Sequence, residues 1–346
     1  MSLNFTEFLR AKARRDPKKV VFPEASEERI LRAARQCRDL NVAYPILIGK
    51  PDDIFSRAQA LGISLSGISI VDHTDETLAT EYVAQYRAAN AVLPEKTLKR
   101  MLRQPLNFAV LMEAVGEVDC TVAGLSHTTG EVILAAQTII GMHHGIETIS
   151  SVAFNSIPGY DGPEKDLLVL ADCAVCPDPT PSELADIAIS SADTTRCLLD
   201  IEPRIALLSF STKGSAMHEK VDRVLEALEI VHRRRPDVLI DGELQLDSAI
   251  DPRVASRKIK DLGGVAGRAN VLVFPDLNAG NIGVKLLQIF GKALSYGPLL
   301  QGFAKPITDL SRGAKVEDIV GAATNVVVLA QTEVAVATNT WSTARG

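Results

Sequence analysis

Seven short apolar runs, rich in β-branched residues, are the feature that most restricts how this chain can fold. Several of them are continuous instead of alternating with polar residues, as strands are when helices cover both faces of a sheet. Stretches in which apolar residues recur at helical spacing lie between these runs. This alternation predicts an α/β protein of mostly parallel sheets with helices on both faces. The runs are VVF at 20, YPILI at 44, CTVAG at 120, DLLVLAD at 166, IALLSFS at 205, VLID at 238 and VLVF at 271.

Individual residues place some of the helices. Apolar side chains at residues 30–37 recur on one face of a predicted helix. Thr180, Pro181 and Glu183 form a capping box with proline in the first turn, so a helix is expected to begin there. Pro236 ends a further predicted helix that starts near residue 221. A chain of 346 residues favours two domains of ordinary size.

Composition excludes several classes of partner. With 43 acidic against 37 basic side chains the net charge is -6, which gives no long-range attraction to nucleic acid or to an anionic membrane. A charged N-terminal segment and the lack of an apolar stretch of about 20 residues predict a cytoplasmic protein. The polar tail around Trp341 is expected to be disordered or to dock on a neighbour.

Cofactor and metal motifs are missing from the sequence. Neither G-x-G-x-x-G after a strand nor G-x-x-x-x-G-K-[ST] occurs. Cys173 and Cys176 form a C-x-x-C pair, but zinc would need a second pair nearby. The five cysteines, an odd number, are expected to be reduced thiols. We therefore expect no metal and no bound cofactor.

Polar loops follow several of the predicted strands. In open α/β sheets ligands bind outside the carboxyl ends of the strands, so these loops are expected to share one crevice. Such residues populate turns in any protein, but together they favour a site for an oxyanion such as phosphate. The candidate binding residues are Ser126, His127, Thr128, Thr129, Lys213, Asn278, Lys285 and Lys305.

The stretch ITDLSRGAKVEDIVG at 307–321 has two interpretations. Glu317 and Asp318 suit the first turn of a helix, where acidic side chains interact favourably with the helix dipole. That interpretation leaves Ser311 and Arg312 unexplained. A hydroxyl donor, a guanidinium that grips phosphate and a nearby carboxylate are what acyl transfer to or from phosphate requires.

The chain resembles the phosphate acetyltransferase (phosphotransacetylase) family over almost all its length up to about residue 330. The motifs that carry this resemblance, in the family's order, are VVFPEASEERILRAA, ILAAQTIIG, DIAISSADT, LLSFSTKGSA, IDGELQLDSAI, VFPDLNAGNIGVK, YGPLLQGFAKP and DLSRGAKVEDIVGAA.

The resemblance implies reversible acetyl transfer between coenzyme A and inorganic phosphate, with coenzyme A as substrate and no other cofactor. It also implies a homodimer and a two-domain fold similar to that of isocitrate and isopropylmalate dehydrogenases. Residues 1–145 plus 295–346 would form the first domain and residues 146–294 the inserted second domain, with the active site in the cleft between them.

Family roles transfer to single positions of this sequence. The catalytic serine falls on Ser311, its neighbouring arginine on Arg312, the general base on Asp318 and a substrate-binding arginine on Arg87. We expect Asp318 to take the proton of the coenzyme A thiol in a dry site as the sulfur attacks acetyl phosphate directly. No acetylated cysteine is needed.

One departure from the family pattern affects the site. Leu134 occupies a position at which the family has an arginine. Either a lysine, with Lys213, Lys285 and Lys305 as candidates, replaces it, or the activity is weak or changed.

Three alternatives follow from this departure and from the fold. The chain could be a regulatory homologue that binds acetyl-CoA or acetyl phosphate, or a transferase that prefers a longer acyl group. The third alternative is a metal-dependent hydroxy-acid dehydrogenase. Asp241, Asp247 and Asp276 could supply the carboxylates for its metal, but the sequence has no candidate for its dinucleotide-binding loop.

Overall fold

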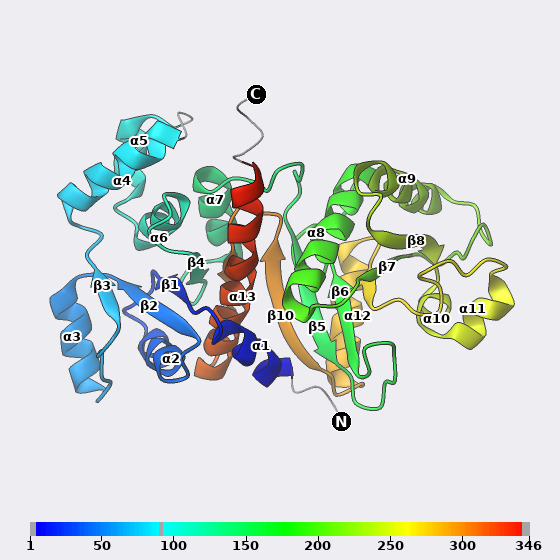
Figure 1. The fold of residues 1–346 in the computed structure, drawn as a ribbon, viewed down its shortest axis with the longest axis horizontal. Coiled ribbons are helices and arrows are strands. Elements are labelled where there is room, and N and C mark those ends of the chain that lie inside the picture. Colours follow the sequence, from blue (N-terminus) through cyan, green and yellow to red (C-terminus); the bar gives the residue numbers. More distant parts are fainter. Residues whose placement is uncertain (1–4, 90–92, 341–346) are drawn as a thin grey trace. The chain divides into compact units, whose positions relative to one another are not determined.

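The computed structural model describes residues 5–89 and 93–340 as two compact units (Figure 1). Of the described residues, one unit comprises residues 142–302 with Phe5, and the other comprises residues 6–89, 93–141 and 303–340. We call them the inserted unit and the split unit. Trp341 and the tail after it lie outside the described residues. No helix in the described part of the chain is long and apolar enough to span a membrane.

The split unit contains a five-stranded sheet in which every pairing is parallel. Its order is β11 (Ile307–Asp309), β4 (Cys120–Ala123), β1 (Lys18–Phe22), β2 (Ala43–Ile48) and β3 (Ser69–Val71). Helix α2 (Glu28–Asp39) and helix α6 (Pro105–Ala114) lie on opposite sides of it (Figure 1). The other helices are α1 (Phe5–Ala13), α3 (Pro51–Ala60), α4 (Glu76–Ala89), α5 (Glu95–Met101), α7 (Thr129–Ile139) and α13 (Val316–Thr340).

The inserted unit contains a six-stranded mixed sheet. Its order is β10 (Leu294–Gln301), β5 (Ser150–Ser156), β6 (Leu167–Ala171), β9 (Val271–Val273), β7 (Arg204–Leu208) and β8 (Leu239–Leu244). The last four run parallel, whereas β5 is antiparallel to β6 and β10 to β5. Its helices are α8 (Pro181–Leu199), α9 (Glu219–Arg234), α10 (Leu246–Ile250), α11 (Pro252–Lys258) and α12 (Leu277–Ile289).

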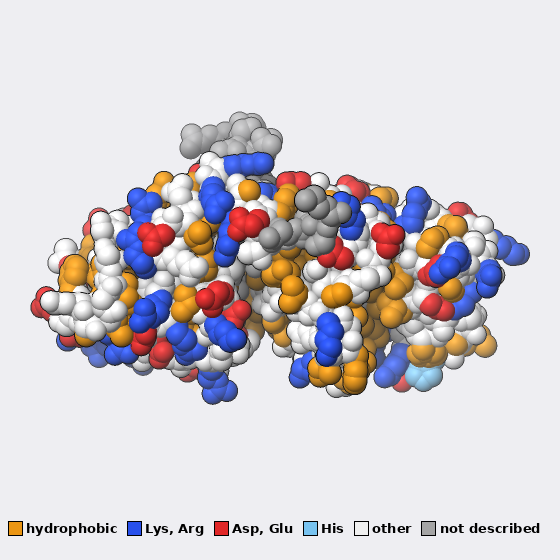
Figure 2. Space-filling model, turned by 90° about the horizontal axis from the view of Figure 1, so that it is seen from below, with side chains coloured by type: hydrophobic (Ala, Val, Ile, Leu, Met, Phe, Trp, Pro, Cys, Tyr) orange, Lys and Arg blue, Asp and Glu red, His pale blue; other side chains and the backbone are white. Residues whose placement is uncertain are grey.

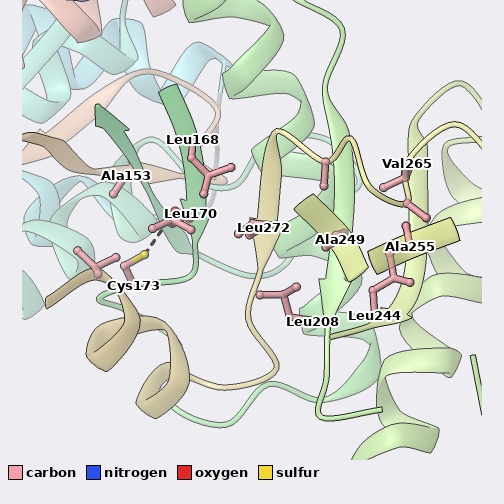
Figure 3. Packing of buried hydrophobic residues seen from close by; sticks show 14 of the residues in the cluster. Ala153, Leu168, Leu170, Cys173, Leu208, Leu244, Ala249, Ala255, Val265 and Leu272 are labelled. Carbon is pink, nitrogen blue, oxygen red and sulfur yellow. Dashed lines mark hydrogen bonds between the residues drawn. The ribbon is translucent and has the colours of Figure 1, made fainter. Parts of the chain in front are cut away.

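Aliphatic side chains fill the core of the inserted unit. Figure 3 shows Leu170 and Leu272 of adjacent strands in one buried cluster with Ala249 of α10 and Ala255 of α11. Leu170 and Leu272 are each 1% exposed. Burial of such side chains is the main favourable term in folding, because it removes apolar surface from water.

All seven predicted strands are present, and the α/β class is confirmed. The helix at 30–37 is also confirmed, as is the capping box at Thr180. Strands β3, β5, β10 and β11 were not predicted. Strands β3 and β11 have only three residues each. The sequences of β5 and β10, SSVAFNS and LSYGPLLQ, contain serine, asparagine and proline, and β5 is enclosed between β10 and β6.

Strand β10 also decides where the chain returns to the split unit. Its pairing with β5 places Leu294–Gln301 in the inserted unit. The return to the split unit therefore begins at Phe303, eight residues after the expected boundary at 295.

Truncating Leu170 should destabilise the inserted unit. Leu170→Ala removes buried methyl groups and leaves a cavity, so we expect the free energy of unfolding to fall by about 2–5 kcal/mol. Leu294→Ala is the matched control, because Leu294 is 63% exposed. Urea unfolding followed by circular dichroism measures both, and equal losses would contradict the packing described here.

Candidate functional site

Three loops meet at one edge of the parallel sheet of the split unit. Strands β1, β4 and β11 are neighbours with the same direction, so their carboxyl ends lie together. Residues 23–27 follow β1, residues 124–128 follow β4 and residues 310–315 follow β11. Six predicted site residues, Ser126, His127, Thr128, Thr129, Ser311 and Arg312, therefore gather at the edge where a ligand is expected.

The carboxylate of Glu24 organises the loop after β4. It accepts hydrogen bonds from four consecutive backbone N–H groups, those of residues 124–127, at 2.7–3.1 Å. Ser126 Oγ donates to it at 2.9 Å, and His127 Nδ1 lies 2.8 Å from its Oε1. Glu24 is only 3% exposed. A buried carboxylate with this many donors holds the loop in one conformation.

The pKa values of Glu24 and His127, the two ionisable groups of this cluster, shift in opposite directions. Burial by itself would raise the pKa of Glu24, but the hydrogen bonds from His127, Ser126 and Leu125 outweigh it and lower that pKa to about 2. The hydrogen bond to Glu24 raises the pKa of His127, against the effect of burial. Glu24 is therefore an anion at neutral pH, and the imidazolium form of His127 is favoured.

Gly124 and Asp309 join the loop after β4 to the segment after β11. Gly124 has φ +118°, and a Cβ there would lie 2.3 Å from Asp309 Oδ1 and 2.5 Å from the backbone nitrogen of Leu310. Asp309 Oδ2 accepts a hydrogen bond from Thr129 Oγ1 at 2.6 Å. Burial raises the pKa of Asp309. Ser311 directly follows Leu310, so these contacts place Ser311 beside the loop that Glu24 holds.

The segment from Ser311 to Asp318 has the helix start that the first sequence interpretation predicts. Helix α13 begins at Val316 with Glu317 and Asp318 in its first turn, and Asp318 Oδ2 accepts the N–H of Lys315 at 2.9 Å, as a capping carboxylate does. Asp318 is exposed, whereas the direct mechanism expects a dry site around it.

Ser311 and Arg312 have exposed side chains in the turn before α13. Arg29 of α2 fixes this turn, since its Nη1 donates to the carbonyl oxygens of Arg312 at 2.9 Å and Ala314 at 2.7 Å. Among the described residues no carboxylate pairs with the guanidinium of Arg312, which is therefore available to an anion.

Two further positions of the split unit, Lys305 and Arg87, have partners of their own, and a third, Leu134, has an exposed side chain. Lys305 precedes β11, at the opposite end of the strand from Ser311, and donates to the carbonyl oxygen of Glu113 at 2.6 Å. Arg87 ends α4 and pairs with Glu95 at 3.3 Å. Leu134 is 64% exposed on α7. The structure thus gives Lys305 a backbone partner remote from the loop after β4.

The inserted unit has its own polar edge. Asn278 lies in the first turn of α12 and Lys285 two turns later, and both are exposed. Lys213, in the loop after β7, pairs with Asp241 and donates to the carbonyl oxygen of Gly242 at 2.8 Å. These positions follow parallel strands β9 and β7, which are adjacent.

The carboxylates considered for a metal have separate partners. Asp241 pairs with Lys213, Asp247 pairs with Lys258 at 2.8 Å, and Asp276 caps α12 by accepting the N–H of Ala279 at 2.9 Å. Within residues 5–89 and 93–340 no three His, Cys, Asp or Glu side chains lie together as metal ligands.

Sequence reasoning missed the residues that shape these loops. Glu24 and Arg29 lie inside the motif VVFPEASEERILRAA and Asp309 lies inside ITDLSRGAKVEDIVG, but the sequence around them gives no sign of their partners, which are about 100 to 285 residues away. Glu24 lies two residues after the end of a predicted strand, and an acidic residue at that position was the one available signal.

Substituting Gly124 tests the contact between the two loops. Gly124→Ala forces a Cβ against Asp309 and Leu310 in addition to the unfavourable φ, so we expect a loss of well over 1 kcal/mol of stability. Gly116→Ala is the matched control. Gly116 also has positive φ, at +86°, but open space surrounds its Cβ position. Equal thermal shifts for the two variants would show that the contact is unimportant.

Acid titration tests the charge of Glu24. The ionised carboxylate contributes its full stability above the unfolded pKa of 4.5, and this contribution is lost as the pH falls through about 2. We expect the stability advantage of the wild type over Glu24→Gln to shrink by about 3 kcal/mol between pH 4.5 and 2. Denaturant unfolding at several pH values measures this difference, and a constant difference would contradict it.

Solved structures of other proteins have folds similar to this one. A phosphotransacetylase from Streptococcus pyogenes has a TM-score of 0.87 and 37% identity, and the match covers 96% of this chain and 99% of that one. A 4-hydroxythreonine-4-phosphate dehydrogenase from Klebsiella pneumoniae has a TM-score of 0.52 at 12% identity, which shows a shared fold alone. The expected dehydrogenase-like architecture is therefore confirmed.

Sequence similarity identifies the family. A phosphate acetyltransferase of Clostridium acetobutylicum is 46% identical over 323 residues, which cover 92% of this chain and 96% of the relative. One of Treponema pallidum is 42% identical over 330 residues, covering 92% and 97%. Residues 4–327 match the family described as "Phosphate acetyl/butaryl transferase". The chain belongs to this phosphate acetyl/butyryl transferase family.

Proposed function

We propose that the protein transfers an acetyl group reversibly between coenzyme A and inorganic phosphate, giving acetyl phosphate and free coenzyme A from acetyl-CoA and phosphate. The observation that supports this most is the gathering of Ser311, Arg312 and the Glu24-anchored loop at one edge of a parallel sheet. The exposed hydroxyl of Ser311 and the exposed guanidinium of Arg312 suit a phosphoryl group.

The chemical step is a direct displacement in a ternary complex. Asp318 accepts the proton of the coenzyme A thiol, and the sulfur attacks the carbonyl carbon of acetyl phosphate. The bond from that carbon to the phosphate oxygen then breaks and releases phosphate. Ser311 donates a hydrogen bond to the oxygen that gathers charge, and Arg312 holds the phosphoryl group. Asp318 is exposed in the free protein, so substrate binding has to exclude water from it.

The cysteines support a route without an acetylated enzyme. Cys120 and Cys173 are buried, and burial raises the pKa of Cys173. Burial, with nearby carboxylates, raises the pKa of Cys176 to about 11. Thiolate is the nucleophilic form, so a thiol with a raised pKa is a poor acetyl acceptor at neutral pH.

The remaining assignments are part of the same proposal. The substrates are the small molecules coenzyme A, phosphate and their acetyl derivatives, with Arg87, Lys213, Asn278 and Lys285 as further binding residues. Basic and acidic side chains are interspersed on the face seen in Figure 2, in keeping with the net charge of -6 and with no nucleic-acid or membrane partner. A homodimer, a cytoplasmic location and a site in the cleft between the two domains stay predictions.

Acetyl is the favoured acyl group because the relatives at 42–46% identity are phosphate acetyltransferases. The family description also includes a longer acyl group. Comparing kcat/KM for acetyl phosphate and butyryl phosphate decides between them, and a preference for butyryl phosphate would contradict the proposal.

Substitution of Asp318 tests the general base. We expect Asp318→Asn to lower kcat by about 10²–10⁴-fold in thioester formation from acetyl phosphate and coenzyme A, because the thiol loses its proton acceptor. Glu317→Gln is the matched control, since Glu317 is the adjacent exposed carboxylate in the same helical turn. Full turnover by Asp318→Asn would refute the assignment.

A serine in place of each candidate acceptor tests the direct route. We expect the triple variant Cys120→Ser, Cys173→Ser and Cys176→Ser to keep activity. Initial rates at varied concentrations of both substrates should give intersecting lines in a double-reciprocal plot. Parallel lines, or a triple variant that folds but does not turn over, would favour a covalent acetyl-enzyme.

A further inference from the structure

The pair formed by Glu24 and His127 does more than hold a loop. The four backbone N–H groups of residues 124–127 already tie the loop to the Glu24 carboxylate. The contact from His127 Nδ1, at 2.8 Å, is additional and fixes the orientation of the ring. The side chain of His127 keeps 22% of its surface exposed, and among the described residues no partner is hydrogen-bonded to Nε2.

The other ionisable side chains hydrogen-bonded to this loop are acidic. Glu24 contacts it from the β1–α2 connection, Glu131 lies in the first turn of α7 and accepts from Thr128 N at 2.7 Å, and Asp309 accepts from Thr129. An anionic substrate at this edge would meet three carboxylates. Of the described side chains hydrogen-bonded within this cluster, the imidazole of His127 is the one that can carry a positive charge.

The geometry of α7 relates the position of the His127 charge to that of residue 134. Long side chains on a helix lean towards its N-terminus, so an arginine at position 134 would reach back over the first turn of α7. That turn begins at Thr129, two residues after His127. A cation at 127 therefore lies on the side of α7 towards which a cation at 134 would extend.

We propose that His127, held by Glu24 through Nδ1, presents a charged imidazolium whose Nε2–H donates a hydrogen bond to a phosphoryl oxygen of the substrate. In this arrangement His127 binds substrate and Glu24 is a positioning residue. No proton is transferred. The imidazolium presents its positive charge to the substrate, and the charge of Glu24, which is 3% exposed, stays buried. The proposal rests on the function proposed above.

Phosphate binding should then depend on pH through His127. Glu24 and Glu131 both favour the charged form of the His127 ring, whereas burial of the ring favours its neutral form. Asp309 interacts with Glu24. The raised pKa of His127 means that the cation persists above the ordinary value of 6.5 and is lost as the pH rises further. The extra affinity for phosphate should therefore be present at pH 6 and disappear at high pH.

The test measures KM for phosphate and for acetyl-CoA from pH 6 to 9 in the wild type, His127→Gln and Glu24→Gln. We expect His127→Gln to raise KM for phosphate about 10–100-fold at pH 6, as loss of a hydrogen bond to a charged group does, and only a few-fold at pH 9. KM for acetyl-CoA should change little. Taking the ratio of variant to wild type at each pH cancels the ionisation of phosphate itself.

Titration of the ring provides a readout that a purely structural role would not affect. In ¹⁵N-histidine-labelled full-length protein, the midpoint of the His127 signal should lie above 6.5 in the wild type and move to lower pH in Glu24→Gln. Glu24→Asp, which keeps the charge, should restore it in part. His232→Gln is the matched control because His232 is exposed on α9.

The outcomes separate this proposal from the proposed function. If His127→Gln turns over with the wild-type KM for phosphate at pH 6, or if the midpoint of a folded Glu24→Gln protein stays unchanged, the pair has no such role and the enzyme assignment survives. If the wild type does not form acetyl phosphate at all, the proposed function is wrong. Phosphate titrated into labelled wild type should still shift the His127 signal if the binding role is right, and no shift would overturn it.

Discussion

The structure of the candidate site depends on a buried carboxylate that accepts backbone N–H groups. Glu24 does this for residues 124–127, at the carboxyl end of β4. Such a loop has no helix or strand to satisfy its donors, so an unpaired N–H would cost about 1–3 kcal/mol for each group. One ionised side chain satisfies four of them. The result is a polar loop with a single conformation at the edge of an apolar sheet.

The inserted unit uses the same solution twice. Asp172, 3% exposed, accepts the N–H groups of Ala174 at 3.0 Å and Cys176 at 2.6 Å after β6. Glu243, 1% exposed, accepts from Ser211 Oγ and from Gly214 N, both at 2.8 Å. In each unit the loops after the parallel strands are therefore fixed before any ligand binds. A loop that is already ordered favours binding because little conformational entropy remains to be lost.

The turn with Ser311 and Arg312 contrasts with these loops. Its backbone is held by Arg29 and by the start of α13, but its functional side chains are exposed. The sequence predicted this turn well, because a serine, an arginine and an acidic first helical turn lie within eight residues. Lys305, two residues before β11, was grouped with them by composition, but strand direction places it at the other end of β11.

The sequence by itself determined the α/β class, seven strands, the capping box at Thr180 and the family motifs, since these depend on neighbouring residues and local periodicity. Tertiary structure alone decided that Glu24 reaches a loop about 100 residues later, that β10 joins β5, and that Gly124 must lack a side chain. The physical reason is that such contacts are fixed by strand order and direction, which bring together groups whose own sequence surroundings carry no sign of the partner.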